Sequence, residues 1–279
     1  MKSATLQQAI TTGVQQALAE DVGSGDITAQ LVPASNQVSA RLISRAKGVL
    51  CGTAWVNEVF NQLDLNVQIS WEKQDGDVLE QNTSIARLSG PARSILTGER
   101  TALNFLQTLS ATATVSRYYA DLVAKFDVQL LDTRKTLPGM RRAQKYAVSV
   151  GGCTNHRMGL FDAFLIKENH ITACGSIAAA ISAARELAAE KPVEVEVENL
   201  EQLKAAIDAD ADIVMLDNFT LQDIKCAVEI NAKRSKLEVS GGITADSLVN
   251  IAAAGVDYIS IGALTKNVQA LDLSLLLDE

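Results

Sequence analysis

The sequence is poor in cysteine, proline and aromatic residues. Its 279 residues include four Cys and four Pro, and aromatic residues make up 4%. Four scattered cysteines without a C-x-x-C pair exclude a disulfide scaffold and a zinc knuckle, and they favour a reducing cytoplasm. With so few aromatic residues, the core must consist mainly of Ala, Val, Leu and Ile. This composition favours helices packed on a parallel sheet over an aromatic-rich β-sandwich.

Positive charge and long apolar runs are also lacking. The chain has 25 Lys and Arg against 33 Asp and Glu, a net charge of −8, so we expect no general nucleic-acid-binding surface. Residues 1–23 have a helical pattern interrupted by Gln and Thr, unlike the apolar run of a signal peptide. The Ala-rich stretch 176–190 contains Arg185 and Glu186, so it predicts a packed helix and no membrane span.

A repeating rhythm of strands and helices begins at residue 128. Short apolar or β-branched runs, each followed by a loop and a helical pattern, start 20 to 35 residues apart at positions 128, 163, 193, 213, 237 and 258. This spacing fits one βα unit, and no tight hairpin turn joins the runs, so we predict parallel strands with crossover helices. A complete (β/α)₈ barrel has eight strands in ~250 residues. Six units therefore predict an incomplete barrel or an open sheet.

The first part of the chain has a different pattern of predicted elements. Three short runs at 39–44, 65–70 and 83–88, punctuated by turn residues, predict antiparallel strands after an N-terminal helix. A long helix should follow within residues 95–126, broken early by Gly98. We therefore predict a smaller α+β domain at 1–108 and an α/β barrel at 109–265. The amphipathic tail 266–279 is expected to dock back, with the first domain as its candidate partner.

Polar residues recur where the predicted strands end. In a parallel α/β barrel the functional groups lie at the C-terminal ends of the strands and in the loops that follow. The strand-end residues are Arg134, Lys135, Lys167, the carboxylates of 194–198, Asp217, Asn218, Ser240, Gly241, Gly242 and Gly262. Six strand ends of this kind predict one shared site on the barrel rim.

Positive charge is concentrated between Asp132 and His170, where seven Lys or Arg stand against three acids. Four of the seven lie at strand ends or in loops and predict an anion site: Arg134, Lys135, Arg157 and Lys167. The other three follow a Pro-Gly pair in a helical pattern, and a solvated helix face is the favoured interpretation for Arg141, Arg142 and Lys145. Both histidines lie in the same stretch. We expect a site role for His156, while a structural role and a site role remain open for His170.

The run VEVEVE at 193–198 places three carboxylates on one face and three valines on the other. If both faces of this strand are buried, the carboxylates must pair with cations or bind a metal ion. The alternative is an edge strand whose polar face is exposed to solvent. Asp217 should supply another carboxylate close by. Two strand-end carboxylates with room for water are typical protein ligands of a phosphate-bound Mg²⁺.

Glycine-rich segments end the last two predicted strands. The segments 240–244 (SGGIT) and 261–263 (IGA) predict a phosphate cup, because glycine lets backbone N–H groups close on phosphate oxygens. Tight turns needed only for packing are the alternative.

Seven segments, in order and over essentially the whole chain, closely resemble the quinolinate phosphoribosyltransferase family. They are GDITA at 25–29, LTGERTALNFLQTLSATAT at 96–114, LDTRKTLPGMR at 131–141, GGCTNHRMGLFDAFLIKENHI at 151–171, VEVEVENLEQ at 193–202, LDNF at 216–219 and VSGGIT at 239–244. The block NHRMGLFDAFLIKENH at 155–170 is the most specific of them.

The resemblance implies transfer of a phosphoribosyl group from 5-phosphoribosyl-1-diphosphate to quinolinate with loss of CO₂. The products would be nicotinate mononucleotide and diphosphate, in NAD biosynthesis. It also implies a Mg²⁺ cofactor and a cytoplasmic homodimer in which Arg100 completes the site of the other subunit. The implied substrate-binding residues are Arg100, Thr133, Arg134, Lys135, His156, Arg157, Lys167, Ser240, Gly241, Gly242, Ile261, Gly262 and Ala263. The implied catalytic residues are Lys135, Lys167, Glu196 and Asp217, of which the last two would hold Mg²⁺.

Other functions are compatible with parts of this pattern. A related phosphoribosyltransferase could accept a different pyridine or pyrimidine acid, because cations that bind carboxylates do not select the ring. Lys167 at a strand end above a phosphate cup could also be the Schiff-base lysine of an aldolase. A non-catalytic binding protein would have little need of paired carboxylates beside a phosphate cup.

Overall fold

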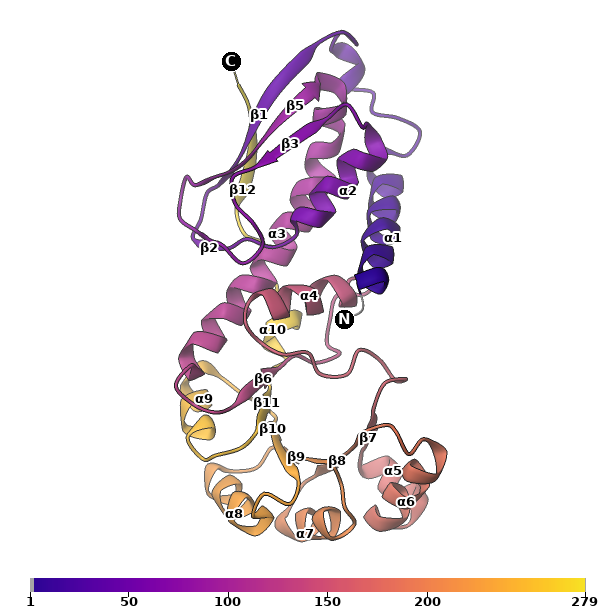
Figure 1. Cartoon of the computed structure of the whole chain (residues 1–279), viewed down its shortest axis with the longest axis vertical. Coiled ribbons are helices and arrows are strands. Elements are labelled where there is room, and N and C mark those ends of the chain that lie inside the picture. Colours follow the sequence, from indigo (N-terminus) through magenta and orange to yellow (C-terminus); the bar gives the residue numbers. More distant parts are fainter. Residues whose placement is uncertain (1–2, 279) are drawn as a thin grey trace. The chain divides into compact units, whose positions relative to one another are not determined.

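The structure, a computed structural model, describes residues 3–278 and divides into two compact units, each described here by itself (Figure 1). Unit 1 comprises Met1–Arg117, Thr136–Gly152 and Leu264–Glu279, and unit 2 comprises Tyr118–Lys135 and Cys153–Ala263. The division therefore falls later in the long helix than residue 108, and unit 1 takes two further segments. Side chains of those segments explain this, since Ala143, Ala147, Leu271 and Leu273 all belong to the hydrophobic core of unit 1.

Unit 1 is built on a four-stranded antiparallel sheet. Its strands follow the order β12-β1-β5-β3, and a separate small pair joins β2 and β4. The bounds are α1 (Ser3–Val22), η1 (Ala29–Leu31), β1 (Gln37–Ser44), β2 (Gly48–Val49), α2 (Thr53–Leu63), β3 (Gln68–Trp71), β4 (Val78–Leu79), β5 (Ser84–Pro91), α3 (Ala92–Val123), α4 (Arg141–Val150), α10 (Ala263–Lys266) and β12 (Leu273–Leu277). The predicted antiparallel strands are confirmed. The C-terminal tail contributes β12, which pairs with β1 so that Ala40 lies opposite Leu277.

The predicted break at Gly98 is wrong, because α3 runs without interruption from Ala92 to Val123. Gly98 is instead a site of close helix packing. A Cβ atom at this position would lie 2.6 Å from Phe60 Cε1 and 2.9 Å from Leu63 Cδ1, both on α2. Position 98 thus needs a residue without a side chain because α2 approaches the backbone there. The reason for this glycine is tertiary packing and not a break in the helix.

Helix α4 departs from its expected solvated face. Lys145 is completely buried, together with Gln144 and the apolar side chains of Ala143, Ala147 and Val148. These residues span more than one face of the helix, so α4 is enclosed on several sides and the exposed-face prediction is wrong for Lys145.

Unit 2 is a curved sheet of six parallel strands in the order β6-β11-β10-β9-β8-β7. Figure 1 shows the helices of this unit on the outer side of the strands. The bounds are β6 (Gln129–Leu131), β7 (Phe164–Ile166), α5 (Glu168–Cys174), α6 (Ile177–Leu187), β8 (Val193–Val197), α7 (Leu200–Asp208), β9 (Ile213–Asp217), α8 (Leu221–Asn231), β10 (Lys236–Ser240), α9 (Ala245–Ala252) and β11 (Tyr258–Ser260). The order makes β6 and β7 the two edges, so the barrel is incomplete. The connection between these edge strands carries α4, which belongs to unit 1.

Polar side chains cap the N-termini of four helices of unit 2. The side chains of Ser176, Asn199, Thr220 and Thr244 each accept a backbone N–H from the first turn of α6, α7, α8 and α9, respectively. Such caps satisfy amides that a helix leaves unpaired at its start. They explain locally why these four helices begin where they do.

Strand register gives the sheet one apolar and one polar face. Paired residues on neighbouring strands point to the same side, and successive residues alternate. On one side lie Val193, Val195 and Val197 of β8 with Val214 and Leu216 of β9, all buried. The opposite side carries Glu194, Glu196, Asp217, Glu238, Ser240 and Ser260. Barrel interiors are mostly filled by Val, Ile and Leu, so this polar face marks the functional side of the sheet.

Among the described residues, no helix has the length and apolar character needed to cross a membrane. The four cysteines are free thiols. Burial, helped by the nearby Asp132 carboxylate, raises the pKa of Cys153 to about 12, so this thiol is not a nucleophile at neutral pH.

Candidate active site

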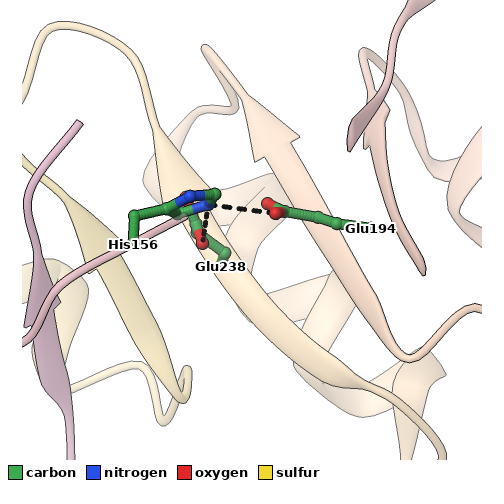
Figure 2. Close-up of side chains that lie close together, drawn as sticks. All are labelled: His156, Glu194 and Glu238. Carbon is green, nitrogen blue, oxygen red and sulfur yellow. Dashed lines mark ion pairs between the residues drawn. The ribbon is translucent and has the colours of Figure 1, made fainter. Parts of the chain in front are cut away.

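A half-buried histidine lies between two buried carboxylates on the polar face of the sheet (Figure 2). His156 Nε2 is 3.0 Å from Glu194 Oε2 on β8 and 3.4 Å from Glu238 Oε2 on β10. The side chains of His156, Glu194 and Glu238 are 11%, 4% and 0% exposed. Ser260 on β11 donates a short hydrogen bond to the other Glu238 oxygen. These four residues are called the histidine cluster below.

The segment that carries His156 is fastened to strand β6. Thr154 pairs with β6 through an isolated parallel bridge to Leu131. The completely buried Asp132 carboxylate accepts the His156 backbone N–H at 2.9 Å and the Asn155 side-chain amide at 2.8 Å. Strand β6 lies at the edge of the sheet, where these bonds take the place of pairing with a further strand. They also hold His156 over the polar face.

The contacts of the His156 ring are those of its neutral form with the proton on Nε2. Nε2 faces the carboxylates, while Nδ1 accepts the backbone N–H of Arg157 at 2.7 Å. Burial opposes a charged ring, whereas the Glu194 and Glu238 carboxylates favour it and raise the pKa of His156. The contact at Nδ1 is nevertheless that of a ring with a single proton, on Nε2. A second proton on the ring would have to sit on Nδ1. Gaining that proton therefore requires His156 to give up its bond to the Arg157 amide.

The environment of Glu194 favours the protonated form of its carboxyl group. Burial, reinforced by the nearby Glu238, raises the pKa of Glu194 to about 7, against the opposing effect of its bond with His156. Two carboxylates in a dry space cannot both be charged cheaply, so protons are shared within the histidine cluster.

Arg157 and Arg134 form a cationic pair beside the histidine cluster. Burial and the neighbouring Arg134 charge lower the pKa of the Arg157 guanidinium, while Glu194 and Asp162 act in the opposite direction. Arg157 is half-buried and donates from Nη1 to the Ala163 carbonyl at 3.3 Å. Two neighbouring guanidinium groups repel each other, so an anion bound between them would be stabilised.

Lys167, at the end of β7, forms a short ion pair with Glu196 of β8. Their side chains are 42% and 13% exposed, which leaves the pair open to a ligand. The backbone N–H of Lys167 donates to Nδ1 of His170 at 3.0 Å, at the start of α5. The exposed His170 thus makes a structural contact at the start of α5.

The loops after β9 and β10 approach each other closely. Asn218 donates its backbone N–H to the Ser240 carbonyl at 3.0 Å. Gly241 has a φ of +100°, and a Cβ atom there would lie 2.1 Å from Asn218 Oδ1. Gly242 also has a positive φ, of +57°. Position 241 therefore requires glycine for both space and conformation.

The loop after β11 offers fewer free backbone N–H groups for a phosphate than its glycine-containing sequence predicts. Ile261 is buried, and its N–H donates to the Leu131 carbonyl at 2.9 Å, so this amide is already used. Gly262 and Ala263 are half-buried. A Cβ atom at Gly262 would be 3.5 Å from Lys135 Cδ, so the exposed Lys135 side chain lies beside this loop.

Two sets of residues have the chemistry of a metal site. Glu196 lies opposite Met215, two positions before Asp217, so these carboxylates share the polar face at adjacent strand ends. Their oxygen atoms fit Mg²⁺, which takes one or two carboxylates and keeps water. The ligand atoms of His156, Glu194 and Glu238 also lie within 4.8 Å of one another. In that cluster the hydrogen bonds already use His156 Nε2 and one Glu238 oxygen.

Almost all the residues expected to bind substrate belong to unit 2, including Thr133, Arg134 and Lys135 directly after β6. Arg100 belongs to unit 1, where it is exposed on α3.

Sequence reasoning did not single out Glu238, Ser260 or Asp132 as site residues. A signal existed for Glu238, because it precedes Ser240 by two residues and must share its face.

Comparisons with known proteins agree along the whole chain. The quinolinate phosphoribosyl transferase N-terminal domain matches residues 26–110, and the C-terminal domain of the same family matches residues 112–276. A probable nicotinate-nucleotide pyrophosphorylase (carboxylating) of Bacillus subtilis is 43% identical over 257 residues, which cover 92% of this chain and 89% of the relative. The nicotinate-nucleotide pyrophosphorylase (carboxylating) of Mycobacterium leprae is 41% identical over 271 residues, covering 94% and 95%. The solved structure of the nicotinate-nucleotide pyrophosphorylase from Francisella tularensis has a TM-score of 0.93 and 52% identity, covering 98% of this chain and 97% of that one.

Proposed function

Because the chain belongs to the quinolinate phosphoribosyltransferase family, we propose that it transfers a phosphoribosyl group to quinolinate and decarboxylates the product. The phosphoribosyl donor is 5-phosphoribosyl-1-diphosphate. The products are nicotinate mononucleotide, diphosphate and CO₂, in NAD biosynthesis. The observation that carries the proposal is the cationic pair Arg134 and Arg157 beside a polar sheet face, a site suited to a ligand with several negative charges.

The residues divide naturally between the two substrates. Arg134, Arg157 and Lys167 would neutralise the carboxylates of quinolinate, a pyridine dicarboxylate; the proximity of the two guanidinium groups supports this assignment. The glycine-rich loop after β10, with its two positive-φ residues, suits the phosphate groups of the donor. Lys135 beside Gly262 is a further cation on that side. Holding both substrates in line lets the pyridine nitrogen attack the anomeric carbon as diphosphate leaves.

Decarboxylation follows from the charge that transfer creates. Once ribosylated, the ring nitrogen is cationic, so it can stabilise the carbanion left when the adjacent carboxylate departs as CO₂. A proton from water then takes the place of the lost carboxylate on that ring carbon. The protein's part in this step is to keep the ring in place with the remaining carboxylate bound to cations. None of the chain's residues needs to form a covalent bond to substrate.

Glu196 and Asp217 would hold Mg²⁺ together with water and the donor's phosphate oxygens. When bound, the ion would neutralise charge that develops on the departing diphosphate. The supporting observation is that both carboxylates lie on the polar face at adjacent strand ends.

A double replacement of the two carboxylates tests the Mg²⁺ site. Glu196→Gln with Asp217→Asn should raise the Mg²⁺ concentration for half-maximal rate by about tenfold, because the amides keep shape and lose charge. The replacement also removes the partner of Lys167. The Mg²⁺ dependence, measured by titration at saturating substrates, is therefore the readout rather than the rate alone. Glu229→Gln, an exposed carboxylate on α8, is the control. An unchanged Mg²⁺ dependence would mean that substrate alone carries the metal.

Quinolinate should be preferred over nicotinate. Nicotinate lacks one of the two carboxylates that the cations would bind, so its kcat/KM should be lower by about ten- to a hundredfold, as expected for one lost charged hydrogen bond. Parallel assays with the same phosphoribosyl donor measure this ratio. Equal or faster turnover of nicotinate would contradict the assignment of the pocket to a dicarboxylate.

The direct test of the proposed function is product formation. The protein is incubated with quinolinate, phosphoribosyl diphosphate and Mg²⁺, and CO₂ and nicotinate mononucleotide are measured. Equimolar release of the two products is expected. Transfer without CO₂ release would instead favour a related phosphoribosyltransferase.

The aldolase alternative has less support from the structure. A Schiff-base lysine needs its amine free to attack a carbonyl carbon. Lys167 Nζ is instead engaged by the Glu196 carboxylate.

We also propose that Arg100 acts in a second subunit's site. Within residues 3–278, this exposed side chain has no ion-pair or hydrogen-bond partner of its own chain. An exposed arginine without a partner in its chain suits a group that a dimer brings to a neighbouring anion site.

A further inference from the structure

The histidine cluster contains more buried charge than substrate binding explains. Glu194 and Glu238 are almost completely buried, and neither Glu194 Oε1 nor Glu238 Oε2 has a hydrogen-bond partner among the described residues. Burying two neighbouring carboxylates is costly unless they are paired, and apolar side chains of similar size would fill a barrel interior more favourably. The two glutamates therefore need a functional reason.

The two carboxylates of the cluster converge on the His156 ring (Figure 2). Ser260 orients Glu238, and Glu238 and Glu194 both face Nε2 of the ring. On the opposite edge of the ring, Nδ1 accepts the backbone N–H of Arg157. Strands β8, β10 and β11 thus all help to set the angle of a single imidazole.

The orientation of the His156 ring fixes the backbone position of Arg157. The ring cannot turn without breaking the 2.7 Å bond to the Arg157 amide. Asp132 holds the other end of the segment through the His156 amide. The backbone of Arg157 is therefore fixed by the ring of the preceding residue, and a fixed backbone limits where a long side chain can place its guanidinium group.

We propose that Glu194 and Glu238 are positioning residues for the transfer reaction: by holding His156 Nε2 between them, they fix the place at which Arg157 meets the quinolinate carboxylate. This assignment rests on the proposed function for its substrate. The glutamates themselves do not touch quinolinate. They act through His156, on the geometry of binding and not on the phosphoribosyl donor.

Kinetics of single amide variants provide the first test. Glu238→Gln and Glu194→Gln keep the side-chain shape but remove a negative charge that faces His156 Nε2, so each should lower kcat/KM for quinolinate by about tenfold. The KM for the phosphoribosyl donor should change less than twofold. Glu229→Gln on α8 is the matched control and should leave both constants unchanged. Equal losses for both substrates would indicate a general structural defect and overturn the proposal.

A double-mutant cycle distinguishes positioning from independent binding. If Glu238 acts through Arg157, Glu238→Gln should have almost no further effect on kcat/KM in an Arg157→Ala background. If the two residues act independently, the losses will multiply, and the positioning role is wrong. Arg157 is half-buried, so its truncation removes little from the core.

The state of the His156 ring can be measured by NMR, independently of enzyme activity. The chain has two histidines, so ¹⁵N-histidine labelling yields two ring systems, and a His170→Asn variant assigns them. In the wild type, the His156 spectrum should be that of a ring with its proton on Nε2. Glu238→Gln should shift the His156 ring nitrogens and Glu229→Gln should not. If the wild type fails to convert quinolinate, the proposed function fails, while the spectra still report whether the glutamates hold the ring. If neither Glu194→Gln nor Glu238→Gln shifts the His156 ring nitrogens, the positioning role is overturned.

Discussion

Replacing Arg157 with Ala should lower kcat/KM for quinolinate by roughly two to three orders of magnitude. Arg157 is half-buried beside Arg134, and a nearby guanidinium and burial already disfavour its charge. A bound carboxylate would relieve this repulsion and form an ion pair shielded from water. Removing one partner of such a pair costs about 3–5 kcal/mol, because the other charge is left uncompensated. Steady-state kinetics with quinolinate varied at saturating phosphoribosyl donor measures the loss.

The matched control for this variant is Arg234→Ala. Arg234 is an exposed arginine of the same unit, paired with Asp208 at 3.1 Å on the surface. Surface pairs of this kind contribute little, so its truncation should leave kcat/KM within about twofold of wild type. A loss below tenfold for Arg157→Ala would mean that its guanidinium group faces solvent and not quinolinate. Melting temperatures of both variants should stay close to wild type.

Mixing two inactive variants should restore about a quarter of the wild-type activity. Arg100→Ala and Arg157→Ala homodimers should each be nearly inactive, because every site lacks one cation. If Arg100 acts in the partner's site, a mixed dimer has one site with both lesions and one with none. Subunit exchange at equal amounts makes half of the dimers mixed, so about a quarter of all sites become complete. The measurement is specific activity before and after exchange.

The outcome of mixing separates two arrangements of the site. If each site is complete within one chain, every site keeps one lesion whatever the mixing, and no activity returns. Two controls accompany the experiment: each variant exchanged with itself, and a size measurement showing that the mixture is dimeric. A monomeric protein with full activity would also contradict a role for Arg100 in the partner's site.

Local patterns in the sequence predicted most of the elements. The alternation at 193–198 correctly placed Glu194 and Glu196 on one face of β8 and three valines on the other. The rhythm of six runs correctly predicted β6 to β11 and their parallel pairing. These predictions succeed because the period of a strand and the length of a βα unit are properties of neighbouring residues.

Predictions that depended on distant contacts were less successful. Gly98 was interpreted as a helix break, but α2 packs against it and the helix continues. Lys145 was placed on a solvated face and is buried. Nothing in the local pattern assigned α4 to unit 1, because its neighbours in that core come from other parts of the chain.

The sequence by itself determined the fold class, the polar strand ends and the cationic segment that contains Arg134, His156 and Arg157. It did so because side-chain alternation and composition are local. Only the tertiary structure decided that Glu238 of β10 and Glu194 of β8 meet at the same ring nitrogen. Strand order and register bring these side chains together, and both arise from packing across the whole sheet. That convergence makes acidic residues of two different strands part of one cluster.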